Sequence, residues 1–60
     1  MSGYRLYYLN PGTGRIESFE PVTASNDDEA IVIATGLGGA RAMELWQQAR
    51  LIRSWEQRKA

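Results

Sequence analysis

The chain contains no cysteine and no histidine. It can therefore form no disulfide and no thiolate metal ligand, and it lacks the commonest nitrogen ligand for zinc, copper and iron. We expect no metal and no cofactor. These absences matter because 60 residues make one domain at most, and a domain of this size buries only about 60% of the surface that its unfolded chain exposes. Unless packing alone suffices, association with another chain is the remaining source of stability.

Groups that act in catalysis near neutral pH are also scarce. Without histidine and cysteine, the nucleophiles reduce to hydroxyls with no evident base, and the single lysine, Lys59, lies next to the last residue. Asp27, Asp28 and Glu29 form a run of carboxylates. Consecutive helical positions point in different directions, however, and acidic residues are typical of the start of a helix. The sequence predicts a protein that is not an enzyme.

A glycine-rich stretch, residues 36–41, follows the apolar residues 31–33 and has the outline of a phosphate-binding loop. The spacing does not fit, because after Gly36 and Gly38 the third glycine or alanine position holds Arg41. The chain is also too short for the doubly wound sheet that such a loop serves. We expect these glycines to end a helix.

Charge is balanced over the chain, with seven basic and seven acidic residues, which gives no support to general nucleic-acid binding. The two halves differ. Residues 1–30 carry two basic and five acidic residues, a net charge of −3, and residues 31–60 carry five and two, a net charge of +3. Such polarity can orient contacts with a partner. No apolar run approaches the roughly 18 residues of a membrane-spanning helix, and no secretion-signal pattern is present, so we expect a cytoplasmic protein without membrane contact.

The first strand-like run, YRLYYL, is apolar on both faces. In an extended strand, Tyr4, Leu6 and Tyr8 point to one face, and Tyr7 and Leu9 point to the other. A chain this short can cover only one face of a sheet with a helix. The second face is therefore predicted to need a partner, although the alternation does not fix which face the helix takes.

A turn and a second strand follow this run. Residues 10–14, NPGTG, combine a proline with two glycines, which is typical of a turn between two strands. The second strand is predicted to begin at Arg15 and to end near Phe19 or Val22. Because Pro21 has no N–H to donate, we expect it at the end of this strand or at the edge of the sheet.

Residues 25–29, SNDDE, predict the start of a helix, because Ser25 or Asn26 can accept from a free backbone N–H and an acidic residue follows three positions later. The helix is expected to run from Asn26 to Leu37. Apolar residues at a spacing of three or four then form one stripe that we expect to be buried. The stripe consists of Ala30, Ile33, Ala34 and Leu37.

Residues 41–58 allow two interpretations. As a helix, they would present an apolar stripe formed by Ala42, Leu45, Trp46, Ala49 and Ile52, but Leu51 and Trp55 would lie outside it. As a hairpin, residues 42–46 and 51–55 would be strands around the turn 47–50. No glycine or asparagine marks that turn. The pattern alone leaves both interpretations open.

Several segments together resemble a family of short, mostly uncharacterised proteobacterial proteins. These are YRLYYL at 4–9, RI at 15–16 after a glycine turn, DDEA at 27–30, ELW at 44–46 and RLI at 50–52. The resemblance implies a hairpin, an acidic-capped helix, a strand with ELW and a return strand, so it favours the hairpin. Members often have a glycine in the last turn, where this chain has Gln48 and Ala49. The resemblance implies no activity and no site residues.

We therefore predict one α+β domain over residues 1–60, in the order ββαββ, with an antiparallel sheet and one helix packed on one face. The alternative is ββαα, with residues 41–58 helical. Four strand residues are expected in the core: Leu6, Ile16, Leu45 and Ile52.

For function, we predict a small interaction module that self-associates, as a homodimer, through the sheet face or edge that the helix leaves uncovered. Aromatic residues and arginine dominate protein interfaces, and the candidate interface consists of Tyr4, Tyr7, Tyr8, Leu9, Trp46, Arg50, Arg53 and Trp55. One alternative is a nucleic-acid-binding or regulatory protein, in which these aromatics stack on bases. Its phosphate contacts would be Arg41, Arg50, Arg53, Arg58 and Lys59. A second alternative is an accessory subunit of a larger complex, which would show the same surplus apolar face.

Overall fold

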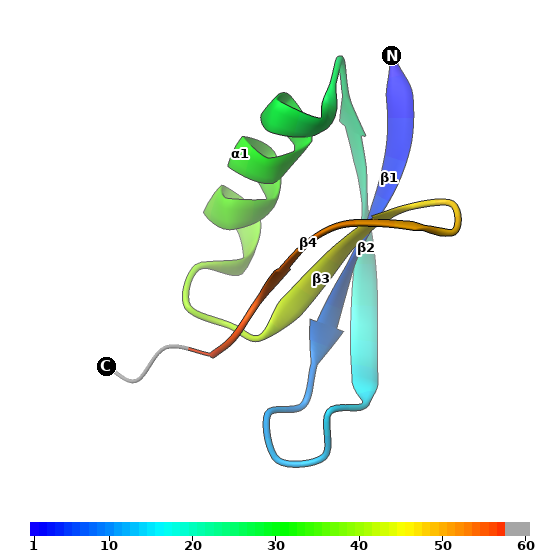
Figure 1. Ribbon diagram of the computed structural model, residues 1–60. Helices are drawn as coiled ribbons and strands as arrows, with labels where there is room; N and C mark the ends of the chain where they lie inside the picture. The colour runs from blue at the N-terminus through cyan, green and yellow to red at the C-terminus, as the bar shows by residue number, and fades with distance from the viewer. Residues whose placement is uncertain (58–60) are drawn as a thin grey trace.

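The computed structural model describes residues 1–57 and contains four strands and one helix. In chain order these are β1 (Ser2–Leu9), β2 (Ile16–Ala24), α1 (Asp27–Gly38), β3 (Met43–Gln47) and β4 (Arg50–Trp55). All neighbouring strands pair antiparallel in one sheet of order β2-β1-β3-β4. The helix packs on one side of this sheet (Figure 1). The predicted ββαββ order is confirmed, and the helical alternative for residues 41–58 is wrong over its described part.

Arg58 and Lys59, which belong to the nucleic-acid alternative, lie outside the described residues. Within residues 1–57, α1 is too short to cross a membrane.

The β1–β2 connection is organised by Asn10. Its side-chain oxygen accepts hydrogen bonds from the backbone N–H groups of Gly12 at 2.8 Å and Thr13 at 3.2 Å. Gly14 has a φ of 74°, a left-handed conformation that favours glycine. Strand β2 then extends to Ala24, beyond its predicted end. It continues through Pro21 because β2 is an edge strand, where a proline nitrogen can face away from the neighbouring strand.

The helix begins as its sequence predicts. Asn26 is the N-cap, and its side chain accepts from the Glu29 N–H at 2.8 Å, while Glu29 Oε1 accepts from the Ser25 N–H at 3.1 Å. The first helical residue is Asp27, because Asn26 has extended backbone angles. At the other end, Gly39 has a φ of 61° and donates to the Thr35 carbonyl at 3.1 Å. Glycine is required there for the positive φ.

The core lies between α1 and one face of the sheet. Its members are buried apolar residues from β1, β2, β3 and α1: Tyr4, Leu6, Tyr8, Val22, Ala24, Ala30, Ala34, Met43 and Leu45. The helix therefore covers the β1 face that carries Leu6. The buried helix positions are Ala30, Ala34 and Gly38, all small, so α1 lies close against the sheet.

Two predicted core residues are wrong. Leu37 is 49% exposed and Ile16 is 57% exposed. The buried positions of α1 are spaced four residues apart, at Ala30, Ala34 and Gly38. Leu37 lies outside the core because it is rotated by about 100° around the helix axis from Gly38. Ile16 pairs with Leu9 beyond a bulge, on the face that lacks a helix. The other predictions hold, since Leu6 and Leu45 are fully buried and Ile33 and Ile52 pack against the core.

Candidate functional site

One face of the sheet has no helix on it, and we call it the open face (Figure 1). Directly paired residues of neighbouring strands point to the same face. Arg5 pairs with Pro21 and Trp46, Tyr7 pairs with Phe19 and Glu44, Leu9 pairs with Ile16, and Trp46 pairs with Leu51. The large side chains of the open face are therefore Arg5, Tyr7, Leu9, Ile16, Phe19, Pro21, Glu44, Trp46 and Leu51. Seven of these nine are apolar or aromatic.

Two aromatic residues and one arginine of the open face pack against one another within the chain. The rings of Tyr7 and Phe19 have centroids 6.0 Å apart and are tilted by 47°. The Arg5 guanidinium carbon lies 5.4 Å from the centre of the Phe19 ring. Phe19 is nevertheless 52% exposed. Aromatic and arginine side chains held in place in this way resemble the anchors of protein interfaces.

Two charges belong to the paired strand residues of this face, one basic and one acidic. Arg5 lies on β1 and Glu44 on the adjacent β3. The Trp46 indole N–H donates to Glu44 Oε1 at 3.0 Å, which orients the carboxylate. The open face is thus apolar, with no net charge among its paired strand residues.

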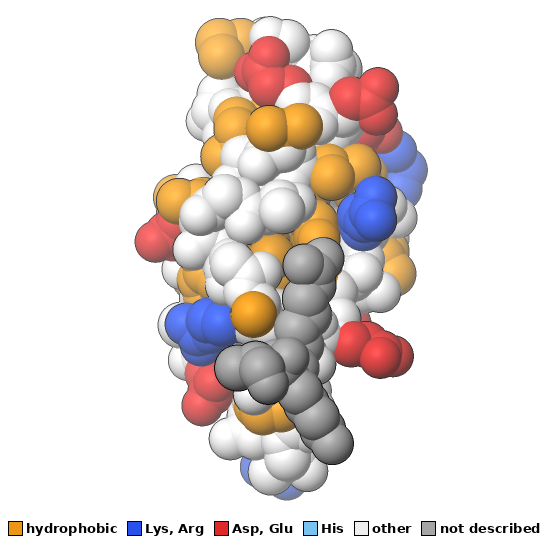
Figure 2. Space-filling view, turned by 90° about the vertical axis from the view of Figure 1, so that its left-hand side faces the viewer, with side chains coloured by type: hydrophobic (Ala, Val, Ile, Leu, Met, Phe, Trp, Pro, Cys, Tyr) orange, Lys and Arg blue, Asp and Glu red, His pale blue; other side chains and the backbone are white. Residues whose placement is uncertain are grey.

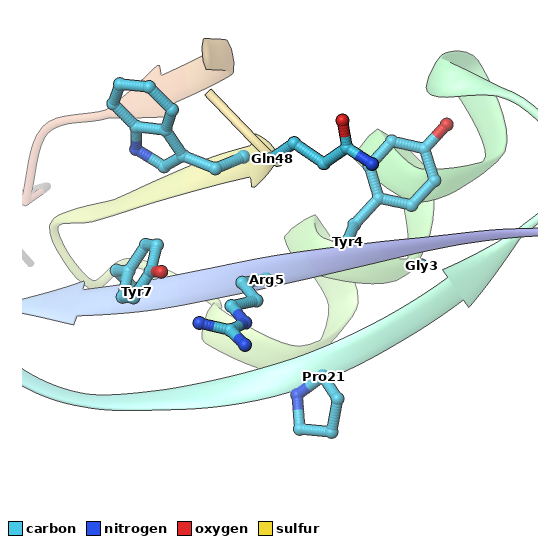
Figure 3. A pocket seen from close by; sticks show the side chains of 7 residues that line it. Gly3, Tyr4, Arg5, Tyr7, Pro21 and Gln48 are labelled. Carbon is cyan, nitrogen blue, oxygen red and sulfur yellow. The ribbon is translucent and has the colours of Figure 1, made fainter. Parts of the chain in front are cut away.

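A pocket of about 500 Å³ lies on the open face near the start of β1. Its lining consists of Gly3, Tyr4, Arg5, Tyr7, Pro21, Trp46 and Gln48. In Figure 3, Arg5 and Tyr7 project from β1 and Pro21 projects from β2, and the side chain of Gln48 also lines the pocket. A Cβ built at Gly3 meets nothing within 4 Å, so the missing side chain of Gly3 leaves space here. The pocket can accept an apolar or aromatic group beside a cation.

The structure divides the eight predicted interface residues among different surroundings. Tyr7, Leu9 and Trp46 are half-buried on the open face. Tyr4 and Tyr8 are buried beneath α1, and burial raises the pKa of both phenols.

The other three predicted residues lie on β4. Trp55 packs against the core, opposite Met43. Arg53 pairs with Leu45, which assigns it to the helix side, and its guanidinium lies 5.8 Å from the Trp55 ring. Arg50 closes the β3–β4 turn, where it pairs with Gln47. The structure therefore does not bring the eight residues together on one surface.

The sequence interpretation missed Ile16, Phe19, Pro21, Glu44 and Leu51 as members of the open face. Phe19 belongs to a weakly alternating strand, and its position follows from pairing with Tyr7. A simple count from the turn would not have found this pair, because a bulge places Phe19 three residues after the start of β2 and Tyr7 two residues before the end of β1.

Arg50 is held by an intramolecular network. Its guanidinium donates to both carboxylate oxygens of Asp27, at 2.9 and 3.2 Å, and also to the side-chain oxygen of Gln47. The Tyr4 hydroxyl donates to Asp27 Oδ1 at 2.8 Å. Hydrogen bonds from Arg50 and Tyr4 lower the pKa of Asp27, and the bonds with Asp27 raise the pKa of Arg50. The network ties β1, the start of α1 and the β3–β4 turn together.

This network predicts an acid-dependent stability. Asp27 has a pKa below its ordinary value in the folded chain, so it stabilises the fold above about pH 4, and this contribution is lost as the pH falls through the lowered pKa. We expect Asp27→Asn to be less stable than the wild type at pH 7 and nearly equal to it at pH 2. Urea unfolding followed by circular dichroism across this pH range measures the difference.

The matched control is Asp28→Asn, which removes a neighbouring charge of the first helical turn and none of these hydrogen bonds. An equal loss of stability at pH 7 in both variants would mean that only the helix dipole is involved and would contradict the role of the network.

The described arginines do not form one basic surface. Arg41 forms an ion pair with Glu17 at 3.5 Å and lies 4.4 Å from the centre of the Tyr8 ring. Arg41 precedes β3 and Arg50 follows it, so they lie at opposite ends of that strand. From the helix side, the basic side chains are not gathered into one patch, and several of them lie next to acidic ones (Figure 2). The described residues offer no continuous phosphate track.

No family model, curated protein or solved structure matches this chain. The resemblance to short proteobacterial proteins stays a prediction. Among residues 1–57, no group of three or more acidic side chains is arranged to hold a metal ion.

Proposed function

We propose that this chain is a non-catalytic interaction module that self-associates as a homodimer through the open face of its sheet. The observation that carries the proposal is the row of aromatic and aliphatic side chains across all four strands of an uncovered face. The resemblance to proteobacterial proteins supports a bacterial source, and we propose the cytoplasm as its location.

The core of one chain is small, which favours further burial of apolar surface by a second copy on the open face. Among residues 1–57, only three large side chains are fully buried, those of Leu6, Met43 and Leu45. The buried positions of the helix are two alanines and a glycine, and Ile31 and Ile33 are only partly buried against the core. Because burial of apolar surface provides roughly 25 cal/mol per Å², a core with few large buried side chains gains little stability from it. A second copy on the open face would bury Phe19 and Leu51, which a single copy leaves in water.

The geometry favours the open face over the sheet edges. The β2 edge carries Pro21 in the middle of the strand, and a proline on an edge opposes pairing with another strand. The β4 edge has six residues, a register shift against β3 and two arginines, Arg50 and Arg53. Short, irregular and charged edges also oppose strand addition. Packing of one sheet face on another needs no such strand addition, because it uses the side chains and leaves the edge backbone unpaired.

The size of the face limits the area that a dimer can bury. The four strands contain 28 residues. Each residue covers an area of roughly 3.3 by 4.8 Å in the plane of a sheet. The projected area is therefore about 440 Å² per copy, below the roughly 800 Å² of surface that a standard interface buries on each partner. We expect a dimer that uses nearly the whole face and has a dissociation constant in the micromolar range.

Sedimentation equilibrium over a range of concentrations tests the proposal. The wild type is expected to reach twice the 6.7 kDa mass of one chain. Phe19→Glu should remain monomeric, because it introduces a charge into the open face. Val32→Glu is the matched control, because Val32 is 72% exposed on α1, away from this face. Circular dichroism checks that both variants fold.

Two results would overturn the proposal. One is a folded wild-type chain that stays monomeric at high micromolar concentration. If that monomer also binds an oligonucleotide with a steep salt dependence, the result favours the nucleic-acid alternative. The other is a dimer that Val32→Glu dissociates and Phe19→Glu does not, because the helix would then form the interface.

A further inference from the structure

Arg5 and Glu44 lie close together at the centre of the open face. Arg5 is directly opposite Trp46, and Glu44 is two residues along β3 from that position. Such diagonal neighbours have Cα atoms roughly 7–8 Å apart. Both belong to the two central strands, β1 and β3. A symmetric partner that covers the face must cover both charges.

The two charges do not neutralise each other within one copy. Arg5 leans over Phe19, on the β2 side of β1. Glu44 accepts from the indole of Trp46 on its own strand. Within residues 1–57, neither Arg5 nor Glu44 forms an ion pair. Each is therefore free to pair with a group above the face, and burying either one unpaired would oppose association.

Two-fold symmetry brings these charges together between copies. Packed sheets keep their strands within about 30° of each other and lie roughly 10 Å apart, and a dimer of identical chains places the same surface on both sides. Overlap is greatest when the axis passes through the middle of the face. One possible axis lies between the two sheets, perpendicular to the strands, and midway between the Arg5–Trp46 pair and the Tyr7–Glu44 pair. It places Arg5 of one copy above the Tyr7–Glu44 pair of the other copy. An axis along the strands, between β1 and β3, brings Arg5 above β3 itself.

We infer that Arg5 of each copy pairs with Glu44 of the other, so that two symmetry-related ion pairs make the open face complementary to itself. This inference rests on the proposed self-association. The pairs make a second copy of this chain the preferred occupant, because a partner must present an acid and a base in the same two positions. The surrounding aromatic residues exclude water and provide the contact area, and the two ion pairs select the partner.

Charge reversal tests the inference. Arg5→Glu leaves two acids on the face and Glu44→Arg leaves two bases, so we expect each variant alone to have a dissociation constant at least tenfold higher than that of the wild type. An equimolar mixture of the two should form a heterodimer, since all facing charges are then opposite. The double variant R5E/E44R should self-associate again. Native mass spectrometry separates the species by mass, and sedimentation gives the dissociation constants.

The matched control is Arg53→Glu, the same charge change on an exposed β4 residue whose partner, Leu45, faces the helix. It should dissociate like the wild type. Folded single variants that dimerise as tightly as the wild type, or a mixture that yields no heterodimer while the wild type is a dimer, would overturn the ion pairs and leave the proposed self-association standing. A monomeric wild type would instead overturn the proposed function on which this inference depends.

Discussion

Gly38→Ala is expected to destabilise the domain by about 1–3 kcal/mol, the usual cost of overpacking a core, although alanine is the better helix former. A Cβ at Gly38 would lie 2.0 Å from Met43 Sδ and 2.7 Å from Met43 Cε, with Tyr8 Cε1 at 3.5 Å. Met43 is fully buried, so its side chain cannot move away without disturbing its neighbours. Chemical unfolding of the variant and the wild type at one protein concentration measures the cost.

Gly36→Ala provides the matched control in the same helix. A Cβ at Gly36 meets nothing within 4 Å, so we expect this variant to be more stable by about 0.5–1 kcal/mol, the ordinary gain from replacing a helical glycine. In a Met43→Ala background, Gly38→Ala should lose most of its cost, because the atoms that its Cβ meets are gone. If both glycine variants were stabilised equally, the close approach of α1 to β3 would be wrong.

Gly38 also illustrates what a hydrophobic pattern misses in a helix. The periodicity predicted α1 and the capping residues predicted its start, because both depend on neighbouring residues. The pattern selected Leu37 as a core residue, since it ranks residues by hydrophobicity. A helix that lies close to a sheet needs small residues at the contact instead. Gly38 was interpreted only as part of a helix end, because the closeness of the sheet is a long-range property.

The β3–β4 turn shows a second limit of local sequence signals. Gln48 has a φ of 54° and is the only non-glycine residue with a positive φ in the described part of the chain. A positive φ at the first central residue alone is typical of a type II′ turn, in which glycine is preferred at that position. Gln48 stands there instead, so the turn lacked a local signal. The resemblance favoured the hairpin, and the structure confirms it.

The open face could be predicted in part. Alternation along β1 assigned Tyr7 and Leu9 to a face opposite Leu6, and the structure agrees. It could not decide which face α1 covers, because that choice depends on what β2 and β3 add beside β1. The choice of aromatic residues for the interface also included Tyr4, which alternation assigns to the face of Leu6. The hydroxyl of Tyr4 reaches Asp27 at the start of α1, a contact between residues 23 positions apart that no short pattern contains.

Leu45→Ala is expected to cost about 2–5 kcal/mol, the range for a buried leucine that leaves a cavity. Leu45 is fully buried on a central strand, opposite Leu6, which is fully buried as well. At roughly 0.05–0.15 kcal/mol per residue, a chain of 60 residues has a free energy of unfolding of only about 3–9 kcal/mol. The substitution therefore removes a large fraction of it, and a lower midpoint of urea unfolding at unchanged slope is the expected measurement.

Leu37→Ala makes the same chemical change on the outside of α1, where the side chain is half-exposed. We expect its effect to stay within about 0.5 kcal/mol, as for other surface positions. The pair separates the two possible helix faces, because a helix rotated to bury the stripe predicted from periodicity would make Leu37→Ala costly as well. A loss of more than about 2 kcal/mol at Leu37 would therefore contradict the packing of α1 through Ala30, Ala34 and Gly38. With that packing, the covered layer ends at the sheet, and Phe19 and Leu51 lie about half-exposed on the opposite side, where the proposed dimer would cover them.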